Sequence, residues 1–102
     1  MMKFINEVDL QGEVGKVYGL RDGRVEYTLK TVQLCEGSRD GEVVARTVWH
    51  ICWESSVTGA AVKSGDQRHI AGSIGQRRYI DSDGNVTTTC AIDVRRSLCV
   101  EP

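Results

Sequence analysis

Two segments of this sequence carry side chains that could bind unpaired nucleobases. One contains Trp49 and Trp53, and the other contains Arg77, Arg78 and Tyr79. Residues four apart on an extended strand lie on the same face, so the two indole rings are predicted to share one surface. Flat rings stack on bases of any sequence, and neighbouring guanidinium groups hold the phosphates between them. The pattern therefore predicts a surface that binds single-stranded nucleic acid.

The candidate residues fall into two chemical classes, each with a structural alternative. Base stacking is assigned to Trp49, Trp53 and Tyr79, although large rings also fill cores and subunit contacts. Phosphate contacts are assigned to four cations: Lys30, Arg46, Arg77 and Arg78. Such cations also occur as solvated charges on strand edges. Because Arg77 and Arg78 are adjacent on one strand, their side chains are expected to point to opposite faces.

Catalysis has one candidate pair, His50 and Cys52, which share a strand face. A cysteine–histidine nucleophile needs an accessible, activated thiol, and nothing else in the sequence supports one. We therefore expect a structural His50, no enzymatic activity, no catalytic residue and no cofactor. The four cysteines lack the C-x-x-C spacing of metal or redox sites, so they are predicted to be reduced thiols, with Cys52 and Cys90 buried in strands.

The composition indicates one mainly β domain spanning residues 1–102. Hydrophobic residues make up 40% of the chain and charged residues 26%, with eleven glycines and a single proline. The formal net charge of −1 argues against binding by bulk electrostatics, but it permits a local basic groove. Because the N-terminus does not resemble a signal peptide and no apolar run approaches the roughly 20 residues of a membrane span, we expect a cytoplasmic protein.

Alternating apolar residues and turn dipeptides divide the chain into five strands and a short helix. The strands are predicted at residues 8–20, 24–34, 43–53, 67–80 and 86–94, with a helix at 55–63 and a tail at 95–102. In the second strand, Val25, Tyr27 and Leu29 fall on one face. Three strands, a helix and two strands is the element order of a five-stranded OB-fold barrel.

These residues resemble bacterial single-stranded DNA-binding proteins (SSBs). Residues 6–15 follow the N-x-V-x-L-x-G-x-x-G pattern of that family, residues 28–31 read Thr-Leu-Lys-Thr, and Trp49-His50 matches its third strand. Residues 65–84 match the fourth strand and its hairpin, so the resemblance covers about residues 6–94. It implies an OB fold, sequence-tolerant binding of single-stranded DNA in replication, recombination or repair, and nucleoid association in a bacterial cytoplasm. It also implies homodimers or homotetramers, with His50 at a subunit contact.

The sequence departs from the family pattern in three places. Cys35 and Ser55 stand where the family usually has aromatic residues, and Trp53 could substitute for one of them. The family's long linker and acidic C-terminal peptide are missing, because the sequence ends at Glu101-Pro102. Since that peptide recruits replication and repair proteins, we do not expect such recruitment here. The alternatives are a PriB-like primosomal adaptor that acts mainly through protein contacts, or a core fragment of a longer protein.

Overall fold

A computed structural model describes residues 2–59 and 61–100 of the chain. The strands are β1 (Val8–Arg21), β2 (Arg24–Glu36), β3 (Val43–Ser55), β4 (Gln67–Ile80) and β5 (Val86–Cys99), with helix α1 (Ser56–Gly59) between β3 and β4. This order confirms the predicted all-β class and the position of the helix. Within the described residues, no helix is long and apolar enough to cross a membrane.

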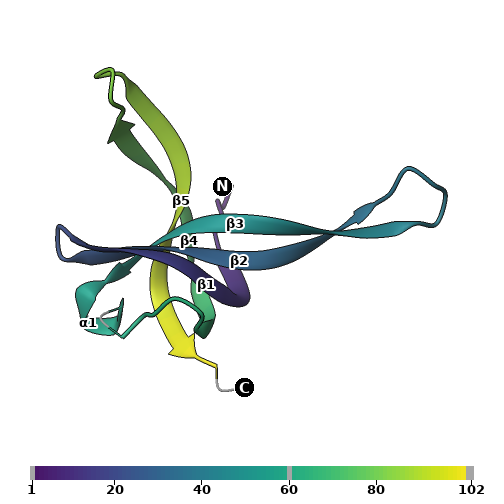
Figure 1. The fold of residues 1–102 in the computed structure, drawn as a ribbon, viewed down its shortest axis with the longest axis horizontal. Coiled ribbons are helices and arrows are strands. Elements are labelled where there is room, and N and C mark those ends of the chain that lie inside the picture. The colour runs from purple at the N-terminus through teal and green to yellow at the C-terminus, as the bar shows by residue number, and fades with distance from the viewer. Residues whose placement is uncertain (1, 60, 101–102) are drawn as a thin grey trace.

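The five strands close into a barrel in the order β1-β2-β3-β5-β4 (Figure 1). Neighbouring strands are antiparallel except β3 and β5, which run parallel over a short stretch. Strand β1 serves both sides of the barrel, because its first half pairs with β4 and its second half with β2. Gly12 lies at this bend, where an added Cβ would collide with the carbonyl oxygen of Lys30. A glycine is therefore required for β1 to coil this tightly.

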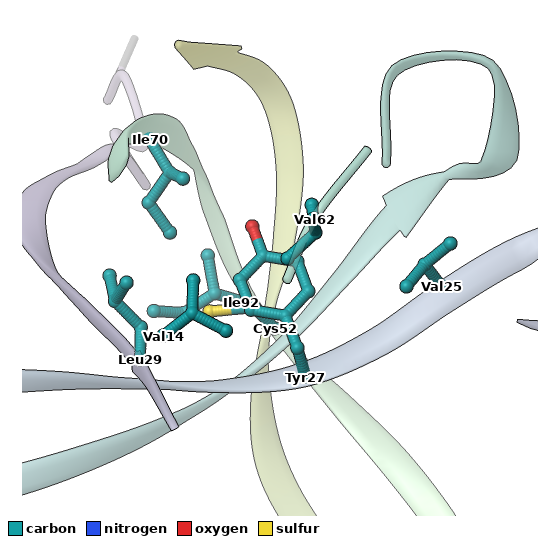
Figure 2. Packing of buried hydrophobic residues seen from close by; sticks show 8 residues of the cluster. All are labelled: Val14, Val25, Tyr27, Leu29, Cys52, Val62, Ile70 and Ile92. Carbon is teal, nitrogen blue, oxygen red and sulfur yellow. The ribbon is translucent and has the colours of Figure 1, made fainter. Parts of the chain in front are cut away.

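The core lies inside the barrel and follows the two-residue period of the strands (Figure 2). Val25, Tyr27 and Leu29 share one face of β2, as predicted, and the structure shows that all three are buried. Cys52 of β3 packs with them. Val14, Val62, Ile70 and Ile92 complete the cluster. Burying each large apolar side chain contributes about 1.5–3 kcal/mol, so this cluster is the main source of stability.

A buried polar network crosses the barrel beside this core. The Tyr27 hydroxyl donates a hydrogen bond to Glu54 Oε1 at 2.8 Å, and Arg68 Nη2 lies 3.9 Å from Glu54 Oε2. Both Nε and Nη2 of Arg68 donate to the Ser97 hydroxyl. Glu54 and Arg68 are 1% and 5% exposed, so each charge depends on the other for compensation. Burial and the bond to Glu54 raise the pKa of Tyr27, which keeps its hydroxyl protonated as a donor.

Two hairpin arms extend beyond the barrel, one formed by β2 and β3 and the other by β4 and β5 (Figure 1). The β2–β3 arm turns at residues 37–42, where Gly41 has a φ of 77°. The β4–β5 arm turns near Gly84, with a φ of 82°. Both arms carry exposed apolar side chains, including Val32 and Leu34 on one and Ile80 and Val86 on the other. The arms are the elements that position the candidate binding residues.

Three sequence-based expectations require correction. The helix covers only Ser56–Gly59 rather than residues 55–63. Strand β5 runs to Cys99, where we expected a tail from residue 95, because β4 needs hydrogen-bonding partners along its first half. Two consecutive arginines at 95–96 interrupt the apolar alternation, so the sequence pattern did not indicate a strand there. Cys90 is exposed rather than buried, since it lies on the β4–β5 arm. Glu101 and Pro102 lie outside the described residues.

Candidate nucleic-acid interface

Three of the seven candidate binding residues, Lys30, Trp49 and Trp53, lie on the outer face of the β2–β3 pair, the side that points away from the barrel core. The strand register places Lys30 opposite Trp49, Thr28 opposite Ile51, and Glu26 opposite Trp53. Since this register is continuous, Trp49 and Trp53 share a face, as their spacing predicted. We call this surface the outer face.

Trp49 provides the outer face with an exposed ring. Its side chain reaches across β2 toward β1, and the residue remains 56% exposed. Gly15 and Thr28 form the surface under this ring, here called its seat: an added Cβ on Gly15 would lie 2.5 Å from Trp49 Cζ3 and 2.7 Å from Thr28 Oγ1. Thr28 is held in place in turn, because the Lys16 backbone N–H donates to Thr28 Oγ1 at 3.0 Å. One side of the ring is thus supported while much of its surface is available to a ligand.

Replacing Gly15 with alanine is expected to weaken binding of oligothymidine by about 5-fold or more without removing any ring, since a stacked base is worth about 1–3 kcal/mol. The new methyl group would push the Trp49 indole off its seat, because Cζ3 cannot remain at 2.5 Å. Fluorescence titration with oligothymidine measures the loss. Gly19→Ala would be a poor control, because Gly19 has a φ of 99° and alanine would be strained in that conformation. The matched control is Ala45→Gly on the β2–β3 arm. Unchanged affinity in Gly15→Ala would show that the seat does not matter.

Trp53 lies on the same face but is 1% exposed. The Arg77 guanidinium carbon lies 3.3 Å from the centre of its ring, a cation–π contact that brings β4 over β3. In this structure a base could reach Trp53 only after Arg77 moves. Sequence patterns did not indicate that Arg77 covers Trp53, because these residues lie on strands that meet only in the fold.

Tyr79 is partly buried beside this pair. Its hydroxyl donates to Glu26 Oε1 at 3.0 Å. Burial raises the pKa of the Tyr79 hydroxyl, and the bond to Glu26 raises it further, so the group remains a proton donor at neutral pH. The nearby Trp53 indole N–H opposes these effects and lowers the pKa of the Tyr79 hydroxyl. Trp53 Nε1 nevertheless makes no hydrogen bond within the described residues. Tyr79 is therefore anchored through Glu26.

The four candidate cations divide between the two faces of the arms. Lys30 lies on the outer face beside Trp49, where Nζ is 3.7 Å from Glu13 Oε2. Both partners of this ion pair are substantially exposed, so a phosphate can compete for the ammonium group. Arg77 shares the face of Tyr79, whereas Arg78 points the other way, as expected for adjacent strand residues. Arg46 likewise lies on the face opposite to Trp49.

His50 lies on the inward side of β3, at an apolar groove between the two arms. The groove has a volume of about 420 Å³, and its walls include Val8, Leu10 and Ile74. His50 Nε2 lies 2.8 Å from Thr31 Oγ1, and burial lowers the pKa of the imidazole, which favours the neutral ring. Burial raises the pKa of the Cys52 thiol to about 12, so a thiolate nucleophile is not available at neutral pH.

Sequence reasoning missed three residues that shape this candidate surface: Gly15, Glu26 and Thr28. Glycines within a strand are typical of a bulge or a sharp coil, but the glycines of β1 do not reveal from sequence that a ring rests on one of them. Glu26 and Thr28 occur among ordinary alternating strand residues. Their roles depend on cross-strand neighbours, which a single sequence does not reveal.

No family model and no curated protein matches the sequence. Two solved structures resemble it along nearly their whole length. A Plasmodium falciparum SSB in complex with ssDNA has a TM-score of 0.74 at 16% identity, covering 99% of each chain. The chain has the OB fold of this SSB. A small single-stranded DNA-binding protein from Streptomyces coelicolor has a TM-score of 0.61 at 16% identity, covering 92% of this chain and 93% of the other.

Proposed function

We propose that this protein is an SSB-type OB-fold protein that binds single-stranded DNA without strong sequence preference. The observation that carries this proposal is the Trp49 ring, 56% exposed and seated on Gly15 beside Lys30. A hydrophobic ring is costly to leave in water, and here the backbone is shaped to hold it in place. Stacking on such a ring accepts any base, which explains tolerance of sequence. The fold shared with two ssDNA-binding proteins supports the same function.

The remaining candidates extend the path of the strand from Trp49. Lys30 is the nearest cation to Trp49 on the outer face and contacts the adjoining phosphate. Tyr79 offers a second ring at the β4–β5 arm, with Arg77 beside it and Trp53 beneath Arg77. Arg46 and Arg78 contact phosphates where the strand passes over the other face of the arms. The path needs no catalytic group and no cofactor.

A second copy of the chain covers the apolar groove on its His50 side and leaves the ring of Trp49, which also lines this groove, open to DNA. The neutral imidazole and the surrounding Val8, Leu10 and Ile74 favour an apolar subunit contact over contact with charged phosphates. Assembly into a homodimer or homotetramer would place several outer faces on one particle and increase its avidity for a long strand. Long stretches of single-stranded DNA arise during replication, recombination and repair in the bacterial cytoplasm.

The dependence of oligothymidine affinity on salt tests this function. Binding should weaken as salt rises, with a slope of log affinity against log salt that falls by about 0.7 when one phosphate contact is lost. Lys30→Ala is expected to show that reduction, and Arg46→Ala and Arg78→Ala test whether the strand also passes over the other face. The control is Arg96→Ala, an exposed cation on β5 away from the arms. Binding that ignores salt, or a slope that Arg96→Ala lowers as much as Lys30→Ala, would contradict the proposed path.

A further inference from the structure

Four side chains, here called the latch, join the outer half of β4 to the β2–β3 pair: Glu26, Trp53, Arg77 and Tyr79. Arg77 covers the Trp53 ring at 3.3 Å, and the Tyr79 hydroxyl donates to Glu26 at 3.0 Å. Within residues 2–59 and 61–100, these are the side-chain polar contacts found between β4 beyond Gly72 and either β2 or β3. At the base of the arm, Ile74 of β4 exchanges two hydrogen bonds with Asn6, β5 pairs with β3 at Ile92–Val94, and Asp93 forms an ion pair with Arg24 of β2. Beyond Gly75, β4 pairs with β5 of its own arm, and the contacts of Arg77 and Tyr79 hold this outer part against the outer face.

The latch occupies groups that single-stranded DNA would otherwise use. An indole face receives a base and a guanidinium receives a phosphate, but here they satisfy each other and leave Trp53 1% exposed. The closed arrangement also leaves Trp53 Nε1 buried without a hydrogen-bond partner. An unpaired buried donor is destabilising, and water would satisfy it if the arm moved away. The closed latch therefore carries a cost that opening relieves.

We infer that the latch is an autoinhibitory contact, which closes the second half of the DNA surface until a strand displaces Arg77 from Trp53. This inference rests on the proposed function, because Trp49 is the ring available when the strand first arrives. A phosphate then draws Arg77 away, a base stacks on Trp53, and Tyr79 leaves Glu26. Glu26 sets the balance of this equilibrium, because its carboxylate accepts the Tyr79 hydroxyl in the closed form and repels phosphates from the same place.

The latch predicts a measurable penalty on affinity. A ligand that binds only the open form loses affinity in proportion to the fraction of protein that is closed. Removing one hydrogen bond of ordinary strength shifts such an equilibrium by about fivefold. Glu26→Ala is therefore expected to bind oligothymidine about fivefold more tightly than the native protein. The matched control is Glu36→Ala, which removes an exposed carboxylate from the same face of β2 but touches no member of the latch.

Fluorine NMR of protein labelled with 5-fluorotryptophan tests the inference, since Trp49 and Trp53 are its two tryptophans. Trp49→Phe identifies which resonance belongs to Trp53. We expect oligothymidine to shift both resonances, and we expect Glu26→Ala without DNA to move the Trp53 resonance toward its bound position, while Glu36→Ala leaves it in place. If DNA shifts Trp49 while Trp53 stays fixed, or if the two glutamate variants bind equally well, the latch is refuted and the proposed function stands. If neither resonance responds to DNA, both fail.

Discussion

Replacing Trp49 with alanine is expected to reduce the affinity for oligothymidine by about 5- to 150-fold, which corresponds to about 1–3 kcal/mol. Trp49 is the exposed ring of the outer face, while Trp53 lies beneath Arg77 and Tyr79 is anchored to Glu26. Of the three rings assigned to base stacking, Trp53 and Tyr79 cannot take the place of Trp49 without movement of the β4–β5 arm. Fluorescence anisotropy of a labelled oligothymidine at low salt measures the change.

Two variants show whether that loss reflects stacking. Trp49→Phe retains a flat ring and should recover most of the affinity, whereas Val32→Ala removes an exposed apolar side chain from the same face and should have little effect. Because Trp49 is largely exposed, its removal should leave the folded state intact, which thermal unfolding can verify. The stacking assignment is refuted if Trp49→Ala binds as tightly as Val32→Ala.

Replacing Glu54 with alanine is expected to lower the free energy of unfolding by about 3–5 kcal/mol. The change would leave the Arg68 guanidinium, 5% exposed, without a carboxylate to balance it, and the Tyr27 hydroxyl without its acceptor. A charge stranded in the interior is far more destabilising than a lost surface contact. Denaturation by urea at a fixed protein concentration measures the difference.

The double variant Glu54→Leu with Arg68→Met separates charge imbalance from loss of packing. Because both charges are removed together, it should recover most of the stability lost in Glu54→Ala. Asp40→Ala, in the exposed turn of the β2–β3 arm, is the surface control and should change stability by less than about 0.5 kcal/mol. A small effect of Glu54→Ala, comparable with that of Asp40→Ala, would mean that the network is unimportant for stability.

The strands and their faces could be predicted because alternation is a local property. Val25, Tyr27 and Leu29 face the core and Trp49 and Trp53 face outward for the same reason, the two-residue period of a strand. The order of strands and helix along the chain also followed from apolar alternation and turn dipeptides, whereas the order of strands around the barrel did not. These features need only neighbouring residues, so one sequence is sufficient to reveal them.

The parts that sequence did not reveal depend on contacts between distant segments. The burial of Trp53 requires Arg77 from another strand, and the seat of Trp49 requires Gly15 from β1. Strand β5 continues through two arginines because β4 supplies hydrogen-bonding partners there, and apolar patterning cannot detect that. The anchoring of Tyr79 by Glu26 is likewise a cross-strand contact. Such contacts decide which of several plausible rings is available.

Photocrosslinking of a 5-iododeoxyuridine oligonucleotide, mapped by mass spectrometry, tests the central claim most directly. This base forms covalent bonds chiefly with aromatic side chains against which it stacks. We predict crosslinks at Trp49, with a second set at Tyr79 or Trp53 as the β4–β5 arm opens. Crosslinks confined to residues outside the two arms, with Trp49 unmodified at saturating oligonucleotide, would contradict the claim that the outer face receives unpaired bases.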